Sequence, residues 1–300
     1  MAAQLSNVIG IDLGGTWIKA VLMSGTGEVL AQTYQPTHGE AQKNWQMAIR
    51  ETVAELKEKS GIPVTAIGLS APGLPNAANS CIAHLPGRLQ GLENLDWSEF
   101  LGQKVSVLND AHAATLAEFH LGAGRGRQHL IMLTLGTGVG GGLILNGQLY
   151  QGLFQKAGHL GHLPLDDRAA PSITGIPGSL EDAIGNATIG RRSHGRYSST
   201  YELLTAYRQH DPFAVWLWLD SVRKLAIGIC GIINAFSPEL VVLGGGITQA
   251  AEDLYQPLAK FMDLYEWRPG GQAVPVIQAH FGDMAGAIGA ASFALARNTP

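Results

Sequence analysis

Cysteine is scarce in this 300-residue chain, where it occurs only as Cys81 and Cys230, neither of them in a C-x-x-C pair. We therefore expect neither a disulfide framework nor a cysteine-built zinc site. No apolar run approaches the ~20 residues that cross a bilayer, so we expect no membrane partner. The first seven residues, MAAQLSN, lack a basic region and an apolar stretch, which argues against a secretory signal and favours a cytoplasmic protein.

An excess of positive charge is absent as well. The chain has 20 Lys and Arg against 24 Asp and Glu, for a net charge of −4, so we expect no nucleic-acid partner. Its hydrophobic content of 46% is ordinary for a globular protein, and its length favours two lobes over one. Composition alone therefore predicts a globular protein of the size of a typical enzyme.

Glycine is the residue that stands out, with 39 copies gathered at a few turns. The first half of the chain predicts three short strands within residues 8–37, followed by a helix because apolar residues recur every three or four positions from Trp45 to Leu56. The elements that follow are a strand at 66–70, a strand at 105–108 and a helix at 111–121.

The second half repeats this order. A strand, a glycine-rich turn and a strand at 129–152 are followed by a helical pattern at 215–233, the strand "LVVLGGG", the strand "AVPVIQAHF" and the helix "AGAIGAASFALA". Two copies of βββαβαβα predict a duplicated α/β fold with an interdomain cleft. We expect a smaller N-terminal lobe of residues 1–120 plus 285–300 and a larger C-terminal lobe of residues 121–284, with the boundary near Phe119 to Gly126.

Two glycine turns, "DLGGT" at 12–16 and "LGTGVGGG" at 135–142, each lie between apolar strands. Glycine allows a tight turn whose backbone N–H groups approach an anion, and threonine hydroxyls add donors. Neither turn matches the P-loop or the dinucleotide fingerprint. A single turn of this kind is often only a hairpin, but two at matching places favour a paired phosphate clamp.

Two aspartates have alternative interpretations. Asp12, at the end of the first strand, is either a turn-forming residue or a carboxylate that holds Mg²⁺ through water. Asp110, between a strand and a helix, is either a helix N-cap or a general base that accepts a proton from an attacking hydroxyl. The spacing alone leaves both questions open.

Several motifs together resemble one family. The segments "IGIDLGGTWIKAVL", "LSAPGL", "LNDAHAATLAE", "TLGTGVGGGLILNGQLYQG", "AGHLGH", "PGSLED" and "LVVLGGGI" are similar to the ROK family of sugar kinases and related repressors. The resemblance runs in order over nearly the whole chain. It implies the actin-like ATPase (ribonuclease H-like) fold and ATP-dependent phosphorylation of a hexose hydroxyl, usually O6, with ATP and Mg²⁺ as cofactors and, as in many relatives, a homodimer.

The resemblance also implies roles for individual residues. Asp110 matches the catalytic base, and Asp12 matches the aspartate of the first phosphate loop. The implied ATP and phosphate ligands are Asp12, Gly14, Gly15, Thr16, Gly136, Thr137, Gly138, Gly244, Gly245 and Gly246. The implied sugar ligands are Gly73, Asn109, Asp110, His159, His162 and Glu181.

The family's zinc loop is altered here. Its pattern C-x-C-G-x-x-G-C-x-E is S-I-T-G-I-P-G-S-L-E in this chain, so Ser172, Thr174 and Ser179 occupy the cysteine positions. Hydroxyls are poor substitutes for thiolates, and His162 alone cannot hold the ion. Although His159 and His162 lie three residues apart, we expect no structural zinc, and we expect Pro177 and local hydrogen bonds to brace the loop.

The sugar-side pattern also departs from the family. His159 stands where the family's E-x-G-H motif has glutamate, and a neutral imidazole has one donor and one acceptor. His-x-Gly-His resembles some N-acetylmannosamine kinases, which makes that activity the alternative to a broader hexokinase. Arg88 falls near a sugar-contacting Asn of the family and is either a sugar contact or a solvated loop residue.

Two further alternatives remain at this stage. A sugar-sensing regulator would resemble this chain plus a helix-turn-helix segment, for which the start of the first strand at about Val8 leaves no room. A kinase-like protein that binds sugar without turnover would not need Asp110.

The helix that contains Trp216 and Trp218 either contributes to a dimer interface or is part of the core.

Overall fold

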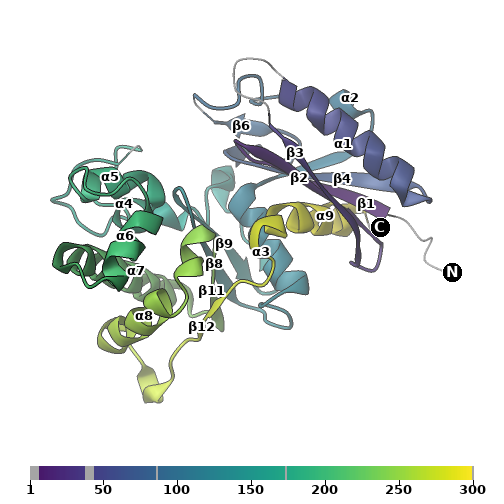
Figure 1. The fold of residues 1–300 in the computed structure, drawn as a ribbon. Coiled ribbons are helices and arrows are strands. Elements are labelled where there is room, and N and C mark those ends of the chain that lie inside the picture. Colours follow the sequence, from purple (N-terminus) through teal and green to yellow (C-terminus); the bar gives the residue numbers. More distant parts are fainter. Residues whose placement is uncertain (1–6, 38–43, 86, 173, 299–300) are drawn as a thin grey trace. The chain divides into compact units, whose positions relative to one another are not determined.

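The computed structural model describes residues 7–37, 44–85, 87–172 and 174–298 (Figure 1). Residues 1–6, on which the expectation about a secretory signal depends, lie outside this range. The chain divides into two compact units. Unit 1 contains Met1–Gly126, Leu149–Ala157 and His280–Pro300, and unit 2 contains Arg127–Gln148 and Gly158–Ala279.

These units differ from the predicted lobes mainly in the segment Leu149–Ala157, which the sequence pattern assigns to the second lobe. Its short helix η1 (Leu153–Gln155) contacts strand β5 (Leu74–Pro75) of unit 1. At its end, the carbonyl oxygen of Ala157 lies 2.7 Å from Nε2 of His112 in helix α3. These two contacts tie the segment to unit 1.

Unit 1 is built on a five-stranded sheet in the order β3-β2-β1-β4-β7. The strands are β1 (Asn7–Leu13), β2 (Trp17–Met23), β3 (Val29–Pro36), β4 (Val64–Ala71) and β7 (Val105–Asn109), and the helices are α1 (Asn44–Ser60), α2 (Trp97–Leu101), α3 (Asp110–Leu121) and α9 (Ala285–Asn298). The smaller elements are β5, β6 (Ile82–His84), η1 and η6 (Gly282–Met284). Apart from the β5–β6 hairpin, the order up to α3 is the predicted βββαβαβα.

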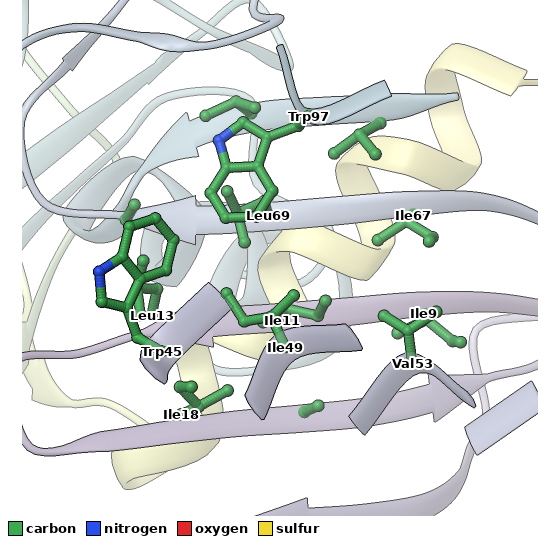
Figure 2. Packing of buried hydrophobic residues seen from close by; sticks show 14 of the residues in the cluster. Ile9, Ile11, Leu13, Ile18, Trp45, Ile49, Val53, Ile67, Leu69 and Trp97 are labelled. Carbon is green, nitrogen blue, oxygen red and sulfur yellow. The ribbon is translucent and has the colours of Figure 1, made fainter. Parts of the chain in front are cut away.

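One face of this sheet forms an apolar core with α1 (Figure 2). Side chains alternate between the two faces of a strand, so Ile9, Ile11 and Leu13 of β1 all point to the same side. There they pack with Ile49 and Val53 from the apolar stripe of α1. The spacing in the sequence therefore predicts both the strand and the helix, and it places the core between them.

Helix α9 packs on the opposite face of the same sheet, with its backbone very close to the backbone of the strands. Gly10 and Gly68 are partners on the neighbouring strands β1 and β4. A Cβ atom on either glycine would collide with a backbone carbonyl of α9. On the other side of α9, a Cβ atom at Gly289 would collide with the carbonyl of Ala113 in α3. Helix α9 is thus held between the sheet and α3 by close backbone packing.

Unit 2 has a second five-stranded sheet, in the order β10-β9-β8-β11-β12. Its strands are β8 (Leu130–Leu135), β9 (Val139–Leu145), β10 (Gln148–Leu149), β11 (Leu240–Gly244) and β12 (Val276–Gln278). Its helices are α4 (Leu180–Ile184), α5 (Ile189–Arg192), α6 (Thr200–Arg208), α7 (Pro212–Phe236) and α8 (Glu252–Tyr265), with the short helices η2 (Leu160–His162), η3 (Asn186–Thr188), η4 (Gly246–Ala250) and η5 (Pro269–Gly271). Both sheets have the spatial order third, second, first, fourth, fifth, which confirms the predicted duplication.

Helix α7 shows why its two tryptophans were difficult to interpret from sequence. Trp218 is buried, with 1% exposure, and its indole N–H donates to the carbonyl of Asp253 at 2.8 Å. Trp216 is 60% exposed. One tryptophan is therefore core and the other is surface, and the homodimer stays a prediction. In the part of the chain that the structure describes, no helix has both the length and the hydropathy to cross a membrane.

Candidate functional site

The carboxyl ends of three parallel strands of unit 1 bring together the predicted polar residues. Strand β1 pairs in parallel with β4, and β4 with β7. Asp12 near the end of β1 lies beside Ser70 of β4, while β7 ends at Asn109 and is followed by Asp110. This edge is where open α/β sheets place their ligands, so it is a candidate ligand site of unit 1.

Asp12 is enclosed on the α9 face of the sheet. The hydroxyl of Ser70 donates to its Oδ1 at 2.7 Å, and a Cβ atom at Gly286 would lie 2.6 Å from its Cγ. Burial raises the pKa of Asp12 to about 6; the Ser70 hydrogen bond opposes this rise, and the negative charge of Asp110 adds to it. The two carboxyl groups therefore sense each other's charge.

The surroundings of Asp12 fit the expected role at a hydrated magnesium ion. Its carboxylate is a hard oxygen donor, and a divalent cation would offset the cost of keeping its charge buried. Within the described ranges, no group of three or more His, Cys, Asp or Glu is arranged to hold a metal ion. An ion here would accordingly take most of its ligands from water and phosphate, which is typical of Mg²⁺.

The start of helix α3 separates two roles that the sequence left open. Asn109, not Asp110, is the N-cap: its Oδ1 accepts the N–H groups of Ala111 at 3.0 Å and His112 at 3.3 Å. Its Nδ2 donates to the carbonyl of Gly73 at 3.1 Å, which joins the two predicted sugar-side residues. Asp110 is the first residue of the helix, so the N-cap interpretation of Asp110 is wrong.

Asp110 remains exposed at this edge of the sheet. The surrounding protein partly desolvates its carboxyl and raises its pKa, whereas the N–H of Ala111 and the positive charge of Arg88 lower it. The Ala111 N–H lies 2.8 Å from Oδ1. An accessible aspartate with a raised pKa has the properties that a general base requires.

Arg88 is presented by a tightly folded loop. Leu89 beside it is buried with a positive φ of 45°, and Gly87 has a φ of 75°. The loop is closed where the N–H of Leu85 donates to the carboxylate of Glu93 at 2.5 Å. The exposed Arg88 side chain is therefore held near enough to Asp110 for its charge to act on that carboxyl.

The second predicted phosphate turn lies in unit 2, between β8 and β9. Gly136 donates its N–H to the carbonyl of Gly138 at 2.9 Å, which closes the turn. The carbonyls of Gly136 and Thr137 accept the N–H groups of Asn186 and Ala187, each at 2.9 Å. The start of helix η3 thus holds the turn through two backbone hydrogen bonds.

Glu181 links this turn to the sugar-side helix α4. Its Oε2 accepts the N–H of Val139 at 2.9 Å, and a Cβ atom at Gly138 would collide with the same carboxylate. Ser179 caps α4 by accepting the N–H of Asp182 at 3.1 Å. The predicted sugar ligand Glu181 is consequently in direct contact with the predicted phosphate turn.

The glycines at the end of β11 lie next to the same turn. Gly244 pairs with Thr134 of β8. Gly245 has a φ of 87°, and a Cβ atom there would collide with the backbone of Leu135, the last residue of β8. Gly246 begins helix η4. Unit 2 therefore brings together two of the three predicted sets of glycines, at 136–138 and at 244–246, while Gly14 and Gly15 lie in unit 1.

His159 directly precedes helix η2 and His162 is its last residue, and the helix packs on β9 and α4. Their rings are nearly parallel, with an interplanar angle of 5° and centroids 6.3 Å apart. A Cβ atom at Gly161 between them would collide with the carbonyl of Val139, so η2 lies close to the residue that Glu181 contacts. Among the described residues, Nδ1 of His162 is buried without a hydrogen-bond partner.

The altered zinc loop is braced by its own hydroxyl groups. Oγ of Ser172 lies 2.9 Å from Oγ1 of Thr174 and accepts the N–H of Ile176 at 3.2 Å. Ser179 is occupied as the cap of α4. With hydroxyls at all three cysteine positions, these residues do not fit a structural zinc ion.

Ser70 and Gly286 contribute to the site without having been predicted from sequence. Ser70 had a weak signal, because it lies near the end of a buried strand that the fold places beside β1. Gly286 had none: it lies more than 270 residues from Asp12 in the chain, and only the packing of α9 brings the two together.

Two sheets of the same strand order, each with a glycine turn after its first strand, define a protein of the actin-like ATPase fold. Within that class, the chain belongs to the ROK family, which it matches over residues 8–297.

The relatives are similar over nearly their whole length. A glucokinase of Thermotoga maritima is 32% identical and matches 95% of this chain and 96% of its own. A ROK hexokinase from Thermus thermophilus, known from a crystal structure, is 33% identical in sequence, with a TM-score of 0.88. The match covers 97% of this chain and 98% of the hexokinase. A ROK family glucokinase from Streptomyces griseus in complex with glucose and AMPPNP is 28% identical, with a TM-score of 0.79 and coverage of 96% and 99%.

Other similar proteins have different names. An N-acetyl-D-glucosamine kinase of Haemophilus influenzae is 30% identical, with coverage of 96% and 99%. A Listeria monocytogenes protein named as a candidate N-acetylmannosamine kinase is 26% identical, with a TM-score of 0.83 and coverage of 98% and 100%. A ROK family transcriptional regulator is 25% identical, with a TM-score of 0.80. The matched region is 95% of this chain and 76% of the regulator.

Proposed function

We propose that this protein transfers the γ-phosphoryl group of MgATP to a hydroxyl, at O6, of a hexose or an N-acetylhexosamine, with Asp110 as the general base. The chain is a sugar kinase of the ROK family, as its similarity to glucokinases and a ROK hexokinase over nearly the whole chain indicates. The observation that carries the proposed chemistry is Asp110 itself. It is an accessible carboxylate that does not cap its helix, and its charge acts on Asp12.

The role of Asp110 follows from its raised pKa and its position. The carboxylate accepts the proton of the attacking hydroxyl as the oxygen–phosphorus bond forms and the bond between the γ-phosphorus and the departing ADP oxygen breaks. A raised pKa makes the carboxylate of Asp110 a stronger base than an ordinary aspartate. Arg88 limits this rise by favouring the charged form.

The glycine turns are proposed to bind the phosphates of ATP. The turn at Gly136–Gly138 is closed by its own hydrogen bond and fixed by η3, so its backbone dipoles need little reorganisation when charge develops on the transferred group. In unit 1 we assign Asp12 to the magnesium of MgATP through water, since Mg²⁺ neutralises phosphate charge and retains several waters. Gly14, Gly15 and Thr16 follow Asp12 in the same turn.

Sugar recognition is proposed to involve Asn109 and Gly73 on unit 1 and His159, His162 and Glu181 on unit 2. The cap uses Oδ1 of Asn109, which leaves an Nδ2 hydrogen for a sugar oxygen. His159 can donate as well as accept, whereas a glutamate at that position could only accept. We therefore expect a sugar with an acceptor such as an acetamido carbonyl near C2, and N-acetylmannosamine is the specific candidate.

A sugar panel in a coupled ATPase assay tests this function. Glucose, mannose, fructose, allose, glucosamine, N-acetylglucosamine and N-acetylmannosamine should include at least one substrate, with the N-acetylated sugars preferred. His159→Glu should shift preference towards the sugars without an N-acetyl group. Sugar binding without any sugar-dependent ATP consumption would instead favour a regulator, and an unchanged preference in His159→Glu would remove His159 from the specificity argument.

A further inference from the structure

Helix α3 carries a second acid, Glu118, two turns beyond Asp110. Glu118 is fully buried, with 0% exposure. Its Oε2 accepts the N–H of Ala123 at 2.9 Å, and its Oε1 accepts the N–H groups of His280 and Phe281, each at 2.8 Å. A buried carboxylate that accepts three backbone N–H groups holds those backbone segments firmly in place, because leaving the N–H groups unpaired in the interior costs free energy. We call this carboxylate the fixing point.

The three donors lie near the point where the chain first leaves unit 1 and at the point where it returns for the last time. The first long segment of unit 1 ends at Gly126, and its last segment begins at His280. Ala123 is three residues before the departure, and His280 is the first residue after the return. One side chain thus fastens both of these connections to α3.

The local backbone is shaped around this carboxylate. The carbonyl of Glu118 accepts the N–H groups of Gly122 at 3.1 Å and Gly124 at 2.9 Å. A Cβ atom at Gly122 would collide with the folded-back carboxylate, so residue 122 has to be glycine for Glu118 to reach Ala123.

Helix α3 connects this fixing point to the reaction. Glu118 and Asp110 lie eight residues apart on one helix, or ~12 Å along its axis. The helix is held against α9 at the contact of Gly289 with Ala113, so it is braced between its two ends. A displacement of either connection is therefore carried to Asp110 by a rigid element.

We propose that Glu118 is a positioning residue: it couples two of the four chain connections between the units, the first and the last, to the helix that carries the general base, so that movement of unit 2 when substrates bind sets the position of Asp110. This inference rests on the proposed kinase function.

Glu118→Gln tests the proposal because it keeps the shape of the side chain but replaces one acceptor oxygen with an NH₂ donor that faces backbone N–H groups. We expect kcat for the sugar to fall on the order of 10-fold to 100-fold, with sugar affinity by equilibrium binding nearly unchanged, since small misplacements of a base affect the chemical step. Hydrogen exchange at Ala123, His280 and Phe281 should accelerate. The ratio of ATP hydrolysed by water to sugar phosphorylated should rise.

Glu266→Gln is the matched control. Glu266 is also a buried carboxylate that accepts a backbone N–H, from Val274 at 2.8 Å, but it lies within unit 2 and holds neither connection. It should lower the melting temperature without changing kcat or the hydrolysis ratio at temperatures well below melting. If Glu118→Gln behaves in the same way, Glu118 is only structural and the proposal is overturned.

Gly122→Ala provides a second variant if Glu118→Gln does not fold. It keeps the carboxylate but displaces it from Ala123, and we expect the same rise in the hydrolysis ratio, with a smaller loss of stability; an unchanged ratio would overturn the proposal. If the wild-type protein showed no sugar-dependent ATP consumption, the proposed function would fail. Unaltered exchange at His280 and Phe281 in Glu118→Gln, or at Ala123 in Gly122→Ala, would separately show that Glu118 does not hold these backbone groups.

Discussion

Asp12 and Gly286 are in such close contact that a Cβ atom at residue 286 would lie 2.6 Å from Cγ of Asp12. Only glycine at this position lets the first turn of α9 approach the carboxylate. The N-terminus of a helix favours a nearby negative charge, but burial is the larger effect and raises the pKa of Asp12 to about 6. The fold therefore retains an acid whose ionised form destabilises it, as is common for functional groups.

Replacing Asp12 with Asn should stabilise the protein while removing its activity. The carboxyl of Asp12 has a pKa of about 6 in the folded state against an ordinary value of 3.8, so its stabilising contribution is complete below about pH 4 and is lost as the pH rises through about 6. Asp12→Asn should raise the free energy of unfolding by at most ~3 kcal/mol at pH 7.5 and by almost nothing at pH 4. Thermal or denaturant unfolding across this pH range measures the difference.

The activity of the same variant gives the second half of this prediction. Loss of the carboxylate should lower kcat/KM for MgATP on the order of 10²-fold or more. Asp283→Asn is the control, because the Asp283 side chain is 65% exposed and its charge adds only a minor share to the rise in the pKa of Asp12. A pH-independent change in the stability of Asp12→Asn would show that the pKa of Asp12 is not raised.

Asp110→Asn should abolish most catalysis without unfolding the protein. Asn109 caps the helix, and residue 110 is exposed, so the substitution removes only the proton acceptor. We expect kcat to fall on the order of 10²- to 10⁴-fold, the usual scale for a general base, with sugar binding nearly unchanged. The melting temperature should not fall, because desolvation raises the pKa of Asp110 and its ionised form therefore does not stabilise the fold. Near-normal turnover in this variant would remove Asp110 from the mechanism.

Arg88→Gln should shift the pH profile of the reaction. Asp110 must be ionised to act, so activity falls as the pH drops through its pKa, which lies above the usual range. Because the positive charge of Arg88 lowers that pKa, its removal should move the acidic limb of kcat/KM to higher pH. The shift should shrink at high salt, since Arg88 is exposed.

Arg125→Gln is the control for Arg88→Gln. It removes an exposed arginine from the same unit and should leave the acidic limb of the kcat/KM profile unchanged. An identical limb in wild type and Arg88→Gln at low salt would show that Arg88 does not act on the base. A loss of sugar affinity on top of the shift would support direct contact of Arg88 with the sugar.

The features that could be predicted from sequence are those set by local pattern. Alternation in β1 and the helical spacing of α1 fix their core faces, and the two glycine turns lie where the pattern places them, between β1 and β2 and between β8 and β9. The duplicated order of elements predicts both sheets. Tertiary register determines the rest: Ser70 joins Asp12 only because β4 pairs with β1, and Gly286 only because α9 returns to unit 1.

The helix cap shows a different limit. Asn109 and Asp110 are both good capping residues, and the sequence cannot say which one begins the helix. The backbone decides it, since Asn109 is extended, with φ −65° and ψ 147°, and Asp110 is already helical. The altered zinc loop is similar: its missing thiolates were visible in the sequence, but the hydrogen bonds of Ser172 that brace it were not.

Gly289→Ala tests whether close backbone packing holds α9 in place. A Cβ atom there would collide with the carbonyl of Ala113, which cannot move without shifting α3, so we expect a destabilisation of ~1–3 kcal/mol or more. Gly231→Ala in α7 is the matched control. It is also a helical glycine, but a Cβ atom there would meet nothing within 4 Å, so the higher helix propensity of alanine should stabilise the protein by up to ~1 kcal/mol. The two substitutions should thus change the midpoint of urea unfolding in opposite directions.

Because α3 carries Asp110, Gly289→Ala should also lower kcat, whereas Gly231→Ala should not. Equal midpoints for the two variants would mean that α9 can withdraw from α3 at little cost, and the view of α3 as a braced helix would have to be abandoned.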